Sequence, residues 1–243
     1  MKKTTLYALC TAFIAACFTG CVIVNFIEHN AITGKGDPET YTFKVGEFNK
    51  LRVEGFNDIH YYAAASDTVT LEVQPNLREY YVVEVINNEL VIHTTRRINF
   101  MGKSEPPKLT VSTPTLNSLN LSGIGTFTGH DKITADFLNL RFSGASEGKA
   151  KLDVKNLTVD FSGAGTFDLS GTAETAAFTM SGAGEINALS LETREARVNL
   201  SGAGTVNVNC TGFLSINASG MGTVSYKGSP SVNINKDGLV SIK

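Results

Sequence analysis

Four aspartates in the second half of the chain are the residues best suited to acid–base chemistry. They are Asp136, Asp153, Asp160 and Asp168. Enzymes that cleave polysaccharides place two carboxyl groups within reach of one glycosidic bond, so these side chains would have to gather on one face. Asp160 and Arg141 occupy the same place in successive copies of a repeat, which favours an exposed ion pair over a catalytic carboxylate.

The sequence gives less support to a metal site or a phosphate-binding loop. The four histidines, His29, His60, His93 and His130, share no ligand spacing, so we expect each of them at the surface or in a loop. Phosphate-binding glycine loops precede a helix, and no apolar stripe of helical spacing extends beyond two turns. Calcium-binding repeats need Asp at one place in successive turns, and that place varies here. We therefore predict no catalytic residue, no metal and no cofactor.

Aromatic residues indicate one region where a ligand could bind. The chain has no Trp, and its tyrosines cluster before the regular repeats, at Tyr61, Tyr62, Tyr80 and Tyr81. This stretch interrupts the repeat, so we expect a ligand region there. The alternative is that these tyrosines cover the end of the fold.

The element that must position these side chains is a repeat of about 20 residues. A Ser-Gly-Xaa-Gly motif or a close variant recurs with steps of 21, 19, 19, 20 and 18 residues. The motifs begin at Ser122, Ser143, Ser162, Ser181, Ser201 and Ser219. Apolar and polar residues alternate before each Ser, which is typical of a strand with one buried face. Strand, corner and return strand in about 20 residues predict an all-β, single-stranded parallel β-helix.

The corner of each repeat is marked by glycine. We expect structural turn glycines with a backbone dihedral that residues bearing a Cβ avoid, at Gly123, Gly144, Gly163, Gly182, Gly202 and Gly220. The residue two places after each Ser is always apolar, and we expect it to point inward. These residues are Ile124, Ala145, Ala164, Ala183, Ala203 and Met221.

The start of the chain has the pattern of a bacterial lipoprotein signal peptide, which we assign to residues 1–20. A basic start is followed by an apolar run that is too short for a stable transmembrane span. Small residues precede Cys21, which we prefer as the lipidated residue, and Cys17 is the rival. Cys210 then has no partner for a disulfide and is expected in a loop or in the core.

Three further segments follow. Residues 21–40 are expected to form a tether. Residues 41–107 form an irregular β region with a degenerate first rung, in which Glu54 takes the place of the Ser. Asn87-Asn88 within it predicts a hairpin turn. Residues 108–243 carry the regular repeats.

The corner motifs followed by Gly184-Glu185-Ile186-Asn187 and Gly204-Thr205-Val206-Asn207 resemble the bacterial family "putative auto-transporter adhesin, head GIN domain". The resemblance covers about residues 43–243. It implies a right-handed β-helix and a cell-envelope location, and the family carries no established catalytic residues. One departure from the pattern is Gly148, where a bulky inward residue is missing.

The net charge of the chain restricts the classes of partner that we expect. A net charge of −2 and a pI near 6.1 argue against nucleic acid as a partner. We predict a non-catalytic, adhesin-like envelope lipoprotein that is held on the outer membrane by its lipid and binds a glycan or protein. The open helix ends would also allow copies to associate. The alternatives are a carbohydrate-active enzyme, either lyase or hydrolase, and a structural spacer or protein scaffold.

Overall fold

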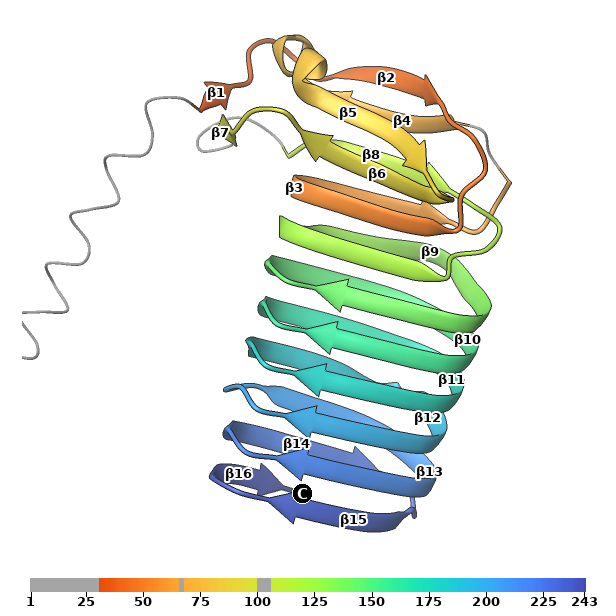
Figure 1. The fold of residues 1–243 in the computed structure, drawn as a ribbon, viewed down its shortest axis with the longest axis vertical. Helices are drawn as coiled ribbons and strands as arrows, with labels where there is room; N and C mark the ends of the chain where they lie inside the picture. The colour runs from red at the N-terminus through yellow and green to blue at the C-terminus, as the bar shows by residue number, and fades with distance from the viewer. Residues whose placement is uncertain (1–30, 66–67, 100–105) are drawn as a thin grey trace, which may run out of the picture.

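The computed structural model describes residues 31–65, 68–99 and 106–243. The described residues are 75% strand and 3% helix, and their parallel coils stack into a β-solenoid of about six turns spaced about 19 residues apart (Figure 1). The predicted β-helix is therefore confirmed. Within the described part, no helix has the length and apolar character to cross a membrane. The expected signal peptide, Cys17 and Cys21 lie outside the described residues.

The regular stack begins at Ser118. Its strands are β9 (Ser118–Phe142), β10 (Ala145–Phe161), β11 (Ala164–Met180), β12 (Ala183–Leu200), β13 (Thr205–Ala218), β14 (Met221–Lys227), β15 (Ser231–Lys236) and β16 (Leu239–Ile242). Each strand pairs in parallel with its counterpart in the next coil, about 4.8 Å away. Polar side chains at the same place in successive coils therefore become direct neighbours along the stack.

The core is a column of apolar side chains inside the coils. Phe142, Phe161 and Met180, each just before a corner Ser, are almost fully buried. At Gly148 the missing bulky side chain is replaced by the Phe167 ring from the next coil, which lies where a Cβ on Gly148 would have to fit. The centroid of the Phe167 ring lies 3.9 Å from that of the Phe142 ring. The Phe167 ring thus occupies the space that the missing side chain at Gly148 would otherwise leave empty.

The first rung is formed by β3 (Lys50–Tyr62), as the sequence predicts. It pairs in parallel with β9, and this register places Glu54 opposite Ser122 and Ile59 opposite Phe127. On the other side of β3 lie β6 (Glu89–Thr94) and β8 (Lys108–Ser112), both parallel to it. The stretch from 108 to 112 thus precedes β3 in the stack, so the regular coils start about ten residues later than the expected boundary.

Antiparallel strands cover this end of the solenoid. β5 (Tyr81–Ile86) turns into β6 through Asn87 and Asn88, whose φ values of 50° and 62° confirm the predicted hairpin turn. β4 (Thr68–Val73) pairs with β8, and β2 (Glu39–Lys44) pairs with β4.

Two short elements complete this end. They are a 3₁₀ helix (Pro75–Tyr80) and the parallel pair of β1 (Ile32–Thr33) with β7 (Ile98–Asn99). Part of the expected tether is therefore paired to the folded domain.

Candidate binding site

The residues two places after each Ser point to solvent, so the inward orientation expected from the sequence is wrong. Ile124 is 56% exposed and Met221 is 61% exposed, and the four alanines between them are exposed as well. The alternation of inward and outward residues continues unbroken through the corner, where glycine occupies the inward place. We call this outward row the corner ladder: Ile124, Ala145, Ala164, Ala183, Ala203 and Met221.

The glycine after each Ser is required by close packing between coils. A Cβ on Gly144 would overlap the carbonyl oxygen of Gly123, and a Cβ on Gly163 would overlap that of Gly144. A positive φ, which we expected at all six turn glycines, occurs among them only at Gly123, where it is 123°. The backbone of the preceding coil therefore excludes a side chain at the other five positions.

A groove of about 480 Å³ opens beside the first half of the corner ladder. Ile124, Ala145 and Ala164 line it from three successive coils, and Pro106 contributes a further apolar surface. Asp58 and Glu147 are the charged residues among the described residues that line it. A smaller hollow of about 240 Å³ shares Thr126 and Glu147 with it. The groove thus combines an apolar surface with negative charge.

Asn57 adds an unused hydrogen-bond acceptor to this region. It is only 3% exposed and lines both the groove and a small cavity of about 10 Å³. Its Nδ2 donates to the carbonyl oxygen of Glu54 at 3.3 Å, which fixes the orientation of the amide. Its Oδ1 has no hydrogen-bond partner among the described residues. Because buried acceptors are nearly always paired, we expect a water or a ligand to donate a hydrogen bond here.

An outward row four places after the corner Ser runs beside the corner ladder, and we call it the acid–threonine ladder. Carboxylates and threonines alternate along it from Asp58 to Thr205, and a further threonine follows. Its members are Asp58, Thr126, Glu147, Thr166, Glu185, Thr205 and Thr223. Acids on alternate coils are about 10 Å apart, because each coil rises about 4.8 Å.

A histidine pair lies on the same face, and the sequence analysis missed it. The Nδ1 atom of His60 is 2.8 Å from the Nε2 atom of His130, and the Nε2 atom of His60 is 3.0 Å from Asp58 Oδ2. The Tyr62 ring stacks on His130, with ring centroids 4.6 Å apart. Thr126 donates its hydroxyl to Asp58, which links this cluster to the groove.

The alignment of the first rung could have revealed the histidine cluster, because it puts Tyr61 opposite Gly129, so that Tyr62 and His130 directly follow two aligned residues. Within the described ranges, no group of three or more His, Cys, Asp or Glu side chains is arranged to hold a metal ion.

Two of the four tyrosines expected in a ligand region belong to the core instead. Tyr61 and Tyr81 are 0% and 4% exposed. The Tyr61 hydroxyl donates to the Thr113 carbonyl oxygen at 2.9 Å, and burial raises the pKa of Tyr61 to about 12. Burial also raises the pKa of Tyr81. Neither side chain can contact a ligand at the surface, whereas Tyr62 and Tyr80 are half-buried.

The aspartates considered for catalysis all have polar partners in a neighbouring coil. Two ion pairs, Lys132–Asp153 and Lys155–Asp136, each close at 2.8 Å, and Arg141 lies 3.4 Å from Asp160 as expected. Asp168 accepts a hydrogen bond of 2.9 Å from an Asn side chain. Hydrogen bonds from Lys132 and Thr172 lower the pKa of Asp153.

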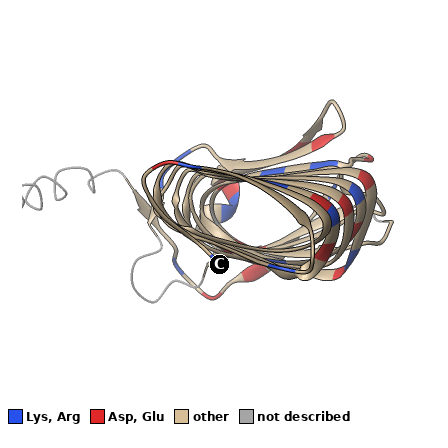
Figure 2. Cartoon of the chain, turned by 90° about the horizontal axis from the view of Figure 1, so that it is seen from below, with Lys and Arg blue, Asp and Glu red and all other residues tan. Residues whose placement is uncertain are grey.

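Opposite the Ser-Gly corner, both signs of charge surround a hollow of about 490 Å³. We call this surface the charged corner. It is lined by charged residues from successive coils: Asp136, Asp153, Lys155, Glu174, Glu192 and Arg194. Figure 2 shows charged residues gathered along one narrow edge of the flattened coils.

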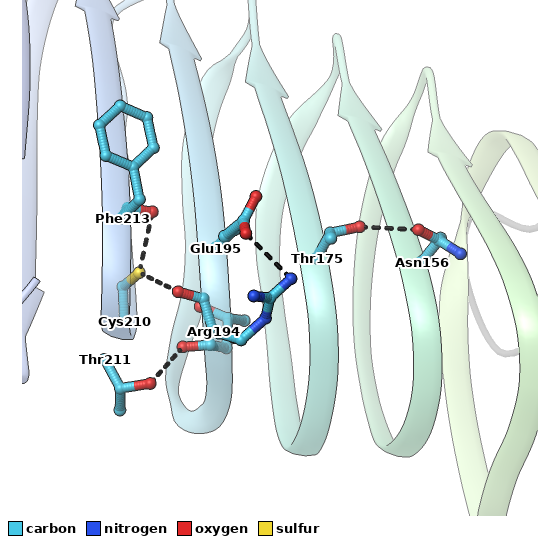
Figure 3. Close-up of polar contacts among 8 residues, drawn as sticks. Asn156, Thr175, Arg194, Glu195, Cys210, Thr211 and Phe213 are labelled. Atoms are coloured by element: carbon cyan, nitrogen blue, oxygen red, sulfur yellow. Dashed lines mark hydrogen bonds and ion pairs between the residues drawn. The ribbon is translucent and has the colours of Figure 1, made fainter.

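Cys210 is a core residue, which is one of the two environments expected for it. It is fully buried, and its thiol lies 3.2 Å from the Phe213 carbonyl oxygen and 3.5 Å from that of Arg194 (Figure 3). Figure 3 also shows a polar contact between coils, in which Thr175 donates to Asn156 at 2.9 Å.

Several solved structures resemble this chain along most of its length. A "putative adhesin" from Bacteroides fragilis NCTC 9343 is 27% identical, with a TM-score of 0.81 over 87% of this chain and 99% of that one. A "putative lipid binding protein" from Parabacteroides distasonis ATCC 8503 is 25% identical, with a TM-score of 0.68 over 87% and 98%.

A "putative adhesin" from Parabacteroides merdae ATCC 43184 is 20% identical, with a TM-score of 0.62 over 88% and 98%, and it supports the fold alone. No curated protein matches. The model of the family "putative auto-transporter adhesin, head GIN domain" matches residues 47–230, and the chain belongs to this family.

Proposed function

We propose that this protein is a non-catalytic, adhesin-like binding module of the bacterial cell envelope that holds its ligand in the groove beside the corner ladder. The observation that carries this proposal is the exposed apolar row at a rigid corner, hollowed where Ile124, Ala145 and Ala164 lie side by side. Exposed apolar surface with a polar rim is typical of binding sites. The family description as an adhesin agrees with this assignment.

The lipid anchor is part of the same proposal. It rests on the apolar leader and on the small residues before Cys21, with Cys17 as the rival site. Acylation would hold the domain at a membrane, for which we propose the outer membrane. The paired segment β1 would then connect the anchor to the capped end of the solenoid and leave the groove free to bind.

A polysaccharide-cleaving enzyme is the second candidate, and one observation favours it. The hollow at the charged corner is lined by four carboxylates from successive coils, among them Asp136 and Asp153. Both of these form ion pairs with lysines, which weakens their case as acid and base. Unpaired carboxyl groups at a suitable separation would be needed for glycoside hydrolysis.

The test is an array of glycans and matrix proteins probed with the mature domain and with Ala164→Arg. Ala164 is exposed, so the new side chain should fill the groove without disturbing the core. We expect the variant to bind at least about tenfold more weakly. Thr134→Arg at the charged corner adds the same charge on an exposed site and should bind like the unmodified domain.

Three outcomes would contradict the proposal. Equal binding by Ala164→Arg would move the ligand away from the groove. Cleavage of any glycan that binds would show that the protein is an enzyme and would make the charged corner the candidate active site. An array without hits would favour the structural spacer or scaffold.

A further inference from the structure

The carboxylates beside the groove have different partners from Asp136, Asp153 and Asp160, each of which forms an ion pair with Lys or Arg. Within the described residues, Glu147 has no ion-pair partner, and Glu185 accepts a hydrogen bond of 2.8 Å from the neutral side chain of Asn207. Asp58 accepts from His60 and Thr126. Among the described residues, no Lys or Arg forms an ion pair with these three carboxylates, although the register places Lys108 opposite Asp58.

The acid–threonine ladder is negatively charged, but basic residues also lie near it. Lys149 lines the smaller hollow, where the register puts it opposite Asp168. Among the described residues that line the groove, none is basic. A ligand that enters the groove therefore meets carboxylates first, and a positively charged ligand is favoured over a negatively charged one.

The carboxylates also have a regular spacing along the solenoid axis. Asp58, Glu147 and Glu185 occupy alternate coils, so neighbouring acids are about 10 Å apart. The threonines between them have short side chains. The corner ladder runs parallel to this row and exposes apolar side chains in the same coils. The surface is thus a straight, two-row template with one apolar row and one row of periodic charge.

An extended peptide has a matching period. In the polyproline II conformation, three residues make one turn with a rise of about 3.1 Å each, so every third residue lies on one face about 9 Å from the previous one. We propose that the groove and the two ladders bind an extended protein segment with Lys or Arg at every third position. Its cationic side chains meet Glu147 and its neighbours, and its intervening residues pack on the corner ladder. This inference rests on the proposed function.

The physical character of such binding follows from exposure. Single contacts between exposed charges are weak and are screened by salt, so affinity must come from several contacts made at once. A segment whose charges follow the spacing of the coils makes these contacts together. A segment with the same charges in one block makes only one of them well.

The experiment uses synthetic peptides and the mature domain, with affinities measured at low and at physiological salt. The probe is a four-repeat Lys-Pro-Pro peptide. The controls are a peptide of identical composition with its four lysines in one block and a four-repeat Glu-Pro-Pro peptide. We expect the periodic lysine peptide to bind at least about tenfold more tightly than either control at low salt, and its affinity to fall as salt is added.

Matched variants locate the contact. Glu147→Gln should weaken binding of the periodic peptide by about threefold to tenfold, and Glu147→Gln with Glu185→Gln should weaken it further. Glu174→Gln removes the same charge from an exposed site at the charged corner and should leave the affinity unchanged. Melting curves of all variants should coincide, because these side chains lie outside the core.

Several results would overturn the inference. Equal binding of the periodic and block lysine peptides would show non-specific charge attraction, and unchanged binding by Glu147→Gln would place the peptide elsewhere. If neither lysine peptide binds but a chitosan oligomer binds and is lost in Glu147→Gln, the groove takes an amino sugar polymer instead. If array ligands still depend on Ala164 while every lysine peptide fails, the inference falls and the proposed function stands.

Discussion

The two corners of each coil differ in the chemical character of the surface that they expose. The Ser-Gly corner exposes the apolar corner ladder and leaves Glu147 without an ion pair among the described residues. The charged corner carries four acidic and two basic residues, and Lys155 and the nearby Lys132 pair with aspartates of the neighbouring coil. Both corners line hollows of almost equal size, about 480 and 490 Å³.

The difference shows that the size of a hollow does not by itself identify a binding site. At the charged corner Asp136 and Asp153 are already paired with lysines, so a ligand that binds either carboxylate would have to displace an ion pair. At the Ser-Gly corner a ligand can contact the apolar side chains and the carboxylates without first displacing a Lys or Arg. We therefore place the proposed ligand at the Ser-Gly corner.

The largest effect is expected where the core behind the Ser-Gly corner depends on one ring. Phe167→Ala should lower the free energy of unfolding by about 3–5 kcal/mol, because the ring is fully buried and also fills the space above Gly148. Phe137→Ala, near the charged corner, should change it by less than about 0.5 kcal/mol, because Phe137 is 68% exposed. Denaturant titration measures both, and similar losses would contradict the assignment of inside and outside.

A smaller loss is expected from adding one methyl group at the Ser-Gly corner. The Cβ in Gly163→Ala would overlap the Gly144 carbonyl oxygen, so the coils must separate locally, at about 2–3 kcal/mol of unfolding free energy. Gly129→Ala is the matched control, because a Cβ there meets only ordinary contacts of 3.5 Å or more and its φ is not positive. Thermal or chemical unfolding compares the two, and equal stability would remove the packing explanation for the corner glycines.

Little effect on stability and a clear effect on binding are expected at the corner ladder. Ile124→Ser should leave the free energy of unfolding within about 0.5 kcal/mol, because the side chain is 56% exposed. Binding of an array ligand should weaken, because part of the apolar surface of the groove is lost. A large loss of stability with intact binding would show that the ladder serves the fold rather than the ligand.

The smallest effect concerns pH at the charged corner. Hydrogen bonds from Lys132 and Thr172 lower the pKa of Asp153 below its ordinary value of 3.8. This carboxylate therefore stabilises the fold above that value, and the contribution is lost as the pH falls through the lowered pKa. Asp153→Asn should reduce this acid dependence slightly, as seen by melting temperature against pH. An NMR titration in which Asp153 ionises above 3.8 would contradict the interpretation.

The repeat, the parallel coils and the register of the first rung could all be predicted from the amino-acid sequence. These features follow from local rules. Alternation of apolar and polar residues defines the buried face of a strand, and a constant repeat length places equivalent residues of successive coils next to one another. The pairing of Arg141 with Asp160 followed from the same period. The hairpin at Asn87-Asn88 followed from its turn residues.

The orientation of the corner residues and the contacts between their side chains depend on how the coils stack and could not be predicted from the repeat alone. Residue type suggested that Ala164 and its equivalents point inward, but they point outward, and backbone contact between coils requires glycine at the inward place directly after each Ser. The contact between His60 and His130 and the groove at Glu147 likewise depend on coils far apart in sequence. Packing between neighbouring coils is not encoded in any single repeat, because each coil acquires its inside and outside only when the next one stacks on it.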